Sequence, residues 1–178
     1  MAYKLSPEEM KRLSLNEFHT SEKLPLIVVL DNVRSLNNIG SIFRTSDAFR
    51  VEHIALCGIT ATPPHREIHK TALGAEDSVA WSHHDDTAQC LRDLKQRGYT
   101  VYAVEQVDDS VMLDSSEWGV GDGKVAIVLG NEIDGVQESL LPLCDGALEI
   151  PQYGTKHSLN VSCAAAIVIW EMHKRLKQ

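Results

Sequence analysis

Two short, uninterrupted apolar segments constrain the fold of this chain more than any other feature. Residues 26–30 read Leu-Ile-Val-Val-Leu, and in the segment 124–129 the residues after Lys124 read Val-Ala-Ile-Val-Leu. A continuous apolar run, rather than an alternating pattern, is typical of a strand that is buried on both faces. Such strands need helices on both sides of their sheet, so the two runs predict the centre of a layered α/β domain.

Strand and helix signals alternate along the rest of the chain. We expect further strands at residues 53–57, 79–81, 99–104 and 147–150. We expect helices at residues 39–49, 88–97, 136–140 and 158–176, and a short helix starting near residue 65 within a long loop at residues 60–77. Residues 108–123 are acidic and contain glycine, which is typical of a loop. This alternation predicts an α/β fold with a mostly parallel sheet flanked by helices.

The first 24 residues predict a helical extension that precedes the main domain. Ser6-Pro7-Glu8-Glu9 combines an N-cap, a proline at the first helical position and a capping-box glutamate, which together predict a helix ending near Asn16. Residues 21–25 then resemble a linker. The chain has 178 residues, of which 43% are hydrophobic, and this suits one globular core. We therefore divide it into an extension at residues 1–24 and a single domain at residues 25–178.

Composition and cysteine spacing narrow the class of protein. The first 22 residues are polar, unlike a signal peptide, and the longest strongly apolar stretch, residues 164–170, is too short to span a bilayer. The 4 cysteines are scattered without a C-x-x-C pair, which argues against disulfides and structural zinc. We therefore expect a reduced cytoplasmic protein with no membrane span and no metal.

The charge of the chain is unevenly distributed. The formal net charge is −8, which taken alone disfavours a nucleic-acid partner. Residues 76–145 hold 15 acidic and 4 basic side chains, whereas the remainder holds 10 acidic and 13 basic ones. An RNA partner could meet a locally basic face made of Arg34, Arg44, Arg50, Arg66, Lys70 and Lys156. An acidic surface that only aids solubility is the alternative, and charge alone leaves both open.

Three segments rich in glycine, asparagine and serine lie next to the predicted strands. They are Asn-Ile-Gly-Ser-Ile-Phe-Arg at 38–44, Leu-Gly-Asn-Glu-Ile-Asp-Gly at 129–135 and Ile-Pro-Gln-Tyr-Gly-Thr-Lys-His-Ser-Leu-Asn-Val-Ser at 150–162. Loops at strand ends bind the ligands of α/β sheets, and these residue types allow close backbone approach and local hydrogen bonds. In order and separation, the trio resembles the signature motifs of the SpoU (TrmH-like) RNA ribose methyltransferases of the SPOUT superfamily, over about residues 25–172.

This resemblance implies a fold and an activity that pattern alone does not show. Pattern alone predicts an open doubly wound sheet, whereas the resemblance implies a SPOUT-type α/β knot with a C-terminal trefoil knot. It implies S-adenosylmethionine as cofactor, methyl transfer to a ribose 2′-hydroxyl of tRNA or rRNA, and a homodimer. The predicted final helix is apolar over more than one face, which also suits burial against a second chain. A non-catalytic RNA-binding or assembly factor on the same fold is the alternative, and the intact motif residues favour the enzyme.

The resemblance makes Arg44 the catalytic arginine of the first motif and Asn38 its partner. A guanidinium scarcely deprotonates in proteins, so we prefer a role in binding substrate phosphate and stabilising the 2′ alkoxide to a role as general base. We expect Asn38 at or before the start of its helix, with Arg44 on the helix body. The alternative for Arg44 is a helical ion pair with Asp47 or Asp31.

The second and third motifs contribute the other implied catalytic residues. By the same resemblance Glu132 orders the site and the cofactor loop, although a turn carboxylate in solvent is the alternative. Ser158 and Asn160 position the ribose or Arg44. Ser158 is also a plausible N-cap of the last helix, whereas capping explains Asn160 less readily. The implied cofactor-binding residues are Leu129, Gly130, Asn131, Ile150, Pro151 and Leu159, with Leu159 against the adenine.

Other chemistries have weaker signals in the sequence. His65 and His69 are spaced for one helix face, but no H-E-x-x-H frame or third metal ligand accompanies them. Residues 121–124 read Gly-Asp-Gly-Lys, which lacks the spacing of a phosphate-binding P-loop. No G-x-G-x-x-G follows the first strand and no G-x-S-x-G is present, which argues against dinucleotide-binding and hydrolase sites.

Overall fold

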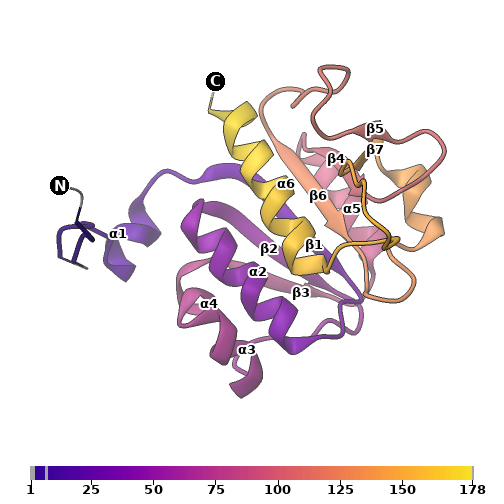
Figure 1. Ribbon diagram of the computed structural model, residues 1–178. Helices are drawn as coiled ribbons and strands as arrows, with labels where there is room; N and C mark the ends of the chain where they lie inside the picture. Colours follow the sequence, from indigo (N-terminus) through magenta and orange to yellow (C-terminus); the bar gives the residue numbers. More distant parts are fainter. Residues whose placement is uncertain (1–2, 7, 178) are drawn as a thin grey trace.

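A seven-stranded sheet with the order β3-β2-β1-β6-β4-β7-β5 forms the centre of the computed structural model, which describes residues 3–6 and 8–177 (Figure 1). All strand pairs in the sheet are parallel. The strands are β1 Leu24–Asp31, β2 Val51–Cys57, β3 Trp81–His84, β4 Thr100–Val104, β5 Val111–Met112, β6 Val125–Leu129 and β7 Gly146–Glu149. This confirms the predicted α/β class with a parallel sheet.

The two apolar runs form the central pair of strands, β1 and β6. Along β1, alternate side chains point to opposite faces, so Val28 joins the core cluster on one side and Ile27 and Val29 join the cluster on the other. Both faces are covered, and burial of each such side chain contributes about 1.5–3 kcal/mol. The uninterrupted hydrophobicity of this strand is therefore a direct consequence of its central position.

Helices form a layer on each face of the sheet. They are α1 Leu15–Thr20, α2 Leu36–Ala48, α3 Arg66–Ala72, α4 Ala75–Ser78, α5 Thr87–Gln96 and α6 Val161–Leu176, with a 3-10 helix, η1, at Glu138–Leu143. Helices α2 and α6 run side by side across one face (Figure 1) and pack against each other. Helix α5 and η1 cover the opposite face, where they share a separate core cluster with β1, β2 and β4.

Several elements differ from the prediction in position or type. The strand expected at residues 79–81 begins at Trp81 instead, and the short strand β5 lies inside the expected loop at residues 108–123. The helix expected at 136–140 is a 3-10 helix that starts at Glu138. These three segments lie at the edges of the sheet or in its connections, where few core contacts constrain the backbone.

The helix predicted from Ser6 to about Asn16 is wrong. The backbone N–H of Ser6 does donate to Glu9 at 2.8 Å, as a capping box requires, but the helical turn ends where Lys11 adopts a left-handed backbone with φ of 47°. Pro7, the proposed first helical residue, lies outside the described residues. A second capping box, at Ser14, does precede a helix, α1. Residue Leu24 begins β1, close to the predicted domain boundary.

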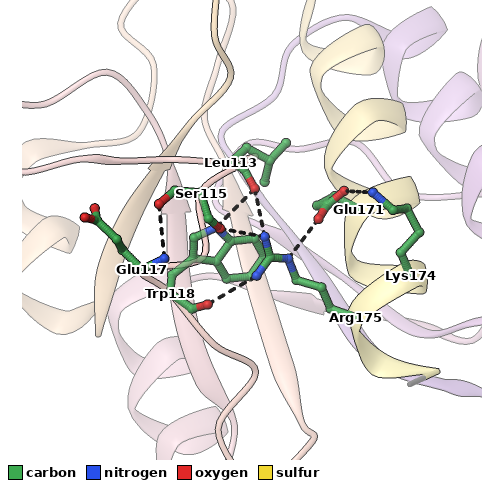
Figure 2. Close-up of polar contacts among 7 residues, drawn as sticks. All are labelled: Leu113, Ser115, Glu117, Trp118, Glu171, Lys174 and Arg175. Atoms are coloured by element: carbon green, nitrogen blue, oxygen red, sulfur yellow. Dashed lines mark hydrogen bonds and ion pairs between the residues drawn. The ribbon is translucent and has the colours of Figure 1, made fainter.

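The C-terminal half of α6 is fastened to the segment that follows β5. Figure 2 shows the guanidinium of Arg175 between Glu171 and the carbonyl groups of this segment. It donates to the carbonyl oxygen of Ser115 at 2.7 Å and lies 3.8 Å from the centre of the Trp118 ring. Planar guanidinium groups suit such combined stacking and hydrogen bonding. This contact holds the β5 edge of the sheet against the helix.

The sequence predicts neither a membrane span nor a metal site. In the part of the chain that the structure describes, no helix is long and apolar enough to cross a membrane. Within the same residues, no group of three or more His, Cys, Asp or Glu side chains is arranged to hold a metal ion. The trefoil knot that the sequence resemblance implies stays a prediction.

Candidate functional site

The carboxyl ends of β6 and β7 and the start of α6 enclose a cavity of about 430 Å³. Small-molecule sites commonly measure roughly 300–1,000 Å³. Most of the predicted cofactor residues line it, namely Leu129, Gly130, Asn131, Ile150 and Leu159, and so do Glu132, Ser158 and Asn160. Pro151 is not among the lining residues, and its neighbour Gln152 takes its place. The second and third motifs therefore meet at one cavity, as the sequence predicts.

A tight turn at residues 130–135 forms one wall of this cavity. Asn131 and Gly135 exchange two backbone hydrogen bonds of 3.1 Å, and the Asn131 side chain accepts from the N–H of Ile133 and Asp134 at 2.9 Å. A Cβ atom on Gly130 would lie 1.9 Å from the carbonyl carbon of Gly135. Glycine is thus needed at 130 because the turn folds back on it.

The carboxylate of Glu132 binds the N-terminal end of α2. It accepts hydrogen bonds from the backbone N–H of Arg34 at 3.2 Å and of Ser35 at 3.1 Å, and from the side-chain amide of Asn38 at 2.9 Å. Partial burial raises the pKa of Glu132, but these hydrogen bonds outweigh it and the pKa is lowered overall. The reading of Glu132 as a free turn carboxylate is therefore wrong.

Asn160 joins the third motif to the first. It is the N-cap of α6, where its side-chain oxygen accepts from the N–H of Ser162 at 2.9 Å and of Cys163 at 3.4 Å. Its amide nitrogen donates to the side-chain oxygen of Asn38 at 3.1 Å. Ser158, expected as the cap, instead lies exposed at the cavity. Asparagine caps as well as serine does, and Asn160 can also reach Asn38.

One continuous chain of hydrogen bonds therefore connects the three motifs. Asn38 contacts Glu132 through its amide nitrogen and Asn160 through its amide oxygen. Asn38 is the third residue of α2, which follows the N-cap Ser35, so it lies within the first turn of the helix and not at or before its start as predicted. We call Asn38, Glu132 and Asn160 the motif bridge.

Arg44 lies apart from both the cavity and the motif bridge. It is exposed on the body of α2 and lines a separate groove of about 830 Å³, together with Lys11, Arg12 and Arg50. Among the residues described by the structure, Arg44 forms no ion pair within 4 Å. Asp47 instead accepts from the Ser78 hydroxyl at 2.5 Å. The alternative of a helical ion pair is thus wrong, and the Arg44 guanidinium remains accessible to a ligand.

Two acidic residues at the ends of strands were not among the predicted site residues, and one of them, Glu105, lines the cavity. Asp31, at the end of β1, is fully buried and accepts from Thr87 at 2.7 Å and from the Gln137 side chain at 2.9 Å. Glu105, directly after β4, lines the cavity and accepts from the backbone N–H of Val136 at 3.0 Å. Both follow parallel strands, so the rule that ligand sites gather at carboxyl ends of strands could have indicated them.

Histidines 65 and 69 do not form a metal site. His65 is the N-cap of α3 and accepts from the N–H of Glu67 at 3.2 Å. His69 contacts Glu76 at 2.5 Å on the surface. Both side chains thus have local structural roles.

Comparison with known proteins agrees with this geometry. Residues 25–170 match the model of the SpoU rRNA methylase family. A tRNA (guanosine(18)-2′-O)-methyltransferase from Thermus thermophilus is 34% identical over 170 residues, which cover 95% of this chain and 85% of that enzyme. A 23S rRNA (guanosine-2′-O-)-methyltransferase, RlmB, from Neisseria meningitidis is 28% identical, and the match covers 91% of this chain but 66% of that enzyme.

Solved structures show the same relationship. The crystal structure of the A. aeolicus TrmH/SpoU tRNA modifying enzyme has a TM-score of 0.79 and 28% identity, covering 92% of this chain and 81% of that one. The AdoMet-bound rRNA methyltransferase from Sinorhizobium meliloti has a TM-score of 0.77 and 29% identity, covering 92% and 61%. The family model spans most of the sequence, and hydrogen bonds of Asn38 connect the first motif to the second and third motifs, which line one cavity. The chain therefore belongs to the SpoU rRNA methylase family.

Proposed function

We propose that this protein transfers the methyl group of S-adenosylmethionine to a ribose 2′-hydroxyl of tRNA or rRNA. The observation that carries the proposal is the motif bridge, because it joins all three family motifs beside a cavity of suitable size. Relatives named as tRNA and as rRNA 2′-O-methyltransferases, and the AdoMet-bound neighbour, support the same reaction. We assign catalysis to residues 25–178 and regard residues 1–24 as an extension.

The cavity has the chemistry that this cofactor needs. Leu148, Ile150 and Leu159 supply apolar surface for an adenine ring, and the tight turn at 130–135 presents backbone polar groups. S-adenosylmethionine supplies an electrophilic methyl group on a sulfonium. A cationic donor and a developing oxyanion lose charge together during transfer, so a partly enclosed site with little water favours the reaction.

The polar residues of the site orient the ribose rather than remove its proton. Glu132 accepts three hydrogen bonds, and these lower its pKa. The carboxylate is therefore a weak base. In our proposal the motif bridge fixes the start of α2 relative to the cavity, and Ser158 contacts the ribose. Arg44 lies apart from the cavity of its own chain, so we propose that it acts where the resemblance implies that the site forms, at the interface between two copies. There its guanidinium, which is exposed and forms no ion pair among the described residues, binds the substrate phosphate and stabilises the 2′ alkoxide.

We also infer that the protein acts as a homodimer in the cytoplasm. Ile167 and Trp170 leave 41% and 53% of their surface exposed on α6, an apolar face that a second copy would cover. Pairing through this helix and one near the first motif is what the family resemblance implies. All four cysteines are free thiols, which fits a reducing compartment.

Methyl transfer from tritiated S-adenosylmethionine to bulk tRNA and rRNA that lack the modification tests the proposal. We expect label in alkali-resistant dinucleotides, since a 2′-O-methyl group blocks alkaline cleavage of the chain. Asn38→Ala, which breaks the motif bridge, should remove most of this label. Tight RNA binding without any transfer would instead favour the non-catalytic assembly factor. Mapping 2′-O-methyl groups in RNA from a deletion strain would then identify the nucleotide.

A further inference from the structure

The charged side chains that line the cofactor cavity are all acidic. They are Glu105, Glu132, Asp134 and Glu149. Of the described residues that form the lining, none is lysine or arginine. The whole chain has a formal net charge of −8. The cavity lining is more negative than an even distribution of that charge over the chain would make it. A ligand that carries positive charge is therefore favoured over its neutral counterpart.

Three of these carboxylates have other roles or other surroundings. Glu132 belongs to the motif bridge and accepts three hydrogen bonds at the start of α2. Glu149 accepts from the hydroxyl of Ser110 at 2.7 Å, which ties β7 to the segment before β5. Asp134 is exposed, so water screens its charge. Glu105 is the remaining member of the set.

Glu105 is partly buried against the turn at residues 130–135. Its two oxygens accept the backbone N–H of Gln106 at 2.9 Å and of Val136 at 3.0 Å. A Cβ atom on Gly135, whose φ is 68°, would lie 2.1 Å from the Glu105 carboxylate, so the two groups are in close contact. Both donors are neutral. Among the described residues no cation pairs with Glu105, so its charge acts on the cavity without a cation to offset it.

We propose that Glu105 is a specificity-determining residue that favours the sulfonium cofactor over its thioether product. S-adenosylmethionine and S-adenosylhomocysteine share the adenosine and the amino-acid group, and they differ by one methyl group and one positive charge at sulfur. A nearby carboxylate stabilises the charged sulfur and does nothing comparable for the neutral one. The product then dissociates more readily than the donor, which limits inhibition as methyl transfer proceeds. The inference rests on the proposed cofactor and adds a residue to its recognition.

Calorimetric titration of the full chain with both compounds tests this role. Glu105→Gln keeps the size and one acceptor but removes the charge. We expect the ratio of the two dissociation constants, product over donor, to fall about three- to tenfold in this variant, the size of one charge–charge interaction in a partly hydrated cleft. Sinefungin, which carries a protonated amine in place of the sulfonium, should weaken in parallel with the donor.

Two variants separate charge from structure. Glu105→Asp retains the carboxylate and should keep a ratio close to that of the wild type, even if both ligands bind more weakly. Asp134→Asn removes an exposed carboxylate of the same cavity and should change the ratio less than Glu105→Gln. An unchanged ratio in Glu105→Gln, or equal weakening of both ligands, would overturn the inference and leave Glu105 as a support for the turn. Failure of the wild type to bind either compound would refute the cofactor assignment itself.

Discussion

At the scale of a single residue, substitution of Arg44 should affect methyl transfer without affecting the stability of the protein. Its side chain is exposed and joins no ion pair among the described residues, so Arg44→Ala should change the free energy of unfolding by less than about 0.5 kcal/mol. If Arg44 stabilises the alkoxide, the same change should lower single-turnover methyl transfer on the order of a hundred- to a thousandfold. Cofactor affinity should stay nearly constant, because Arg44 does not line the cavity.

The lysine variant sharpens this test. Arg44→Lys keeps the charge but loses the planar fork that can grip phosphate and hydroxyl together, so it should recover little activity. Near-normal transfer by Arg44→Ala would remove the catalytic assignment. Full recovery by lysine would reduce the role of Arg44 to its charge.

Ionisation of Glu132 should make the stability of the protein depend on pH. Burial raises its pKa, but hydrogen bonds from Asn38 and from the N–H groups of Arg34 and Ser35 lower it below the unfolded value of 4.5. A carboxylate with a depressed folded pKa stabilises the protein above pH 4.5, and this contribution is lost as the pH falls further. The difference in urea midpoint between the wild type and Glu132→Gln should therefore be largest near neutrality and shrink in acid. A difference that persists unchanged in acid would rule out ionisation of Glu132 as its source.

At the scale of elements, the start of α6 combines a structural and a functional contact in one residue. Asn160→Ala removes the N-cap of this helix, which should cost about 1 kcal/mol of unfolding free energy and also break the contact with Asn38. Asn160→Ser restores a capping oxygen but has no amide to donate. It should recover most of the stability while methyl transfer stays low, as measured by urea unfolding and by single-turnover transfer.

Ser158→Ala is the matched control for this helix. Ser158 is exposed and does not cap α6, so its loss should change stability by less than about 0.5 kcal/mol. If Ser158→Ala destabilised the protein as much as Asn160→Ala, the observed cap assignment would be incorrect. Full activity in Asn160→Ser would mean that the amide bond to Asn38 is dispensable.

At the scale of the whole molecule, the exposed apolar face of α6 predicts the oligomeric state. Ile167→Glu should convert the homodimer to a monomer, because an unpaired carboxylate would be buried at the interface. Trp170→Glu should also produce a monomer. It additionally removes the edge-to-face contact between the rings of Trp170 and Phe49, whose centres lie 5.7 Å apart. Sedimentation velocity at micromolar concentration gives the measurement, with circular dichroism to check the fold. Met112→Glu, on the edge strand β5, should remain dimeric. A wild-type monomer would contradict the proposal outright.

Most helices and strands could be predicted from local sequence patterns, because burial of a strand and the end of a helix leave their marks on neighbouring residues. The continuous apolar runs of β1 and β6 reflect burial on both faces, and Gly98 follows α5 with φ of 83°, as a helix end favours. The false helix at Ser6 shows the limit of such signals. Its capping contacts form, yet Met10 and Leu13 remain exposed, and without packing a single turn does not extend.

The sequence by itself determined the α/β class and the family motifs, and most of the predicted cofactor residues do line the cavity. Only the tertiary structure decided how those motifs meet. Asn38 bonds to Glu132 across 94 positions in the sequence and to Asn160 across 122, and Asn160 rather than Ser158 caps α6. The same holds for Glu105, whose carboxylate acquires its place against Gly135 only when β4 and the turn after β6 lie side by side. Helix and strand signals arise between neighbours in the chain, whereas a site arises between residues that only folding brings together.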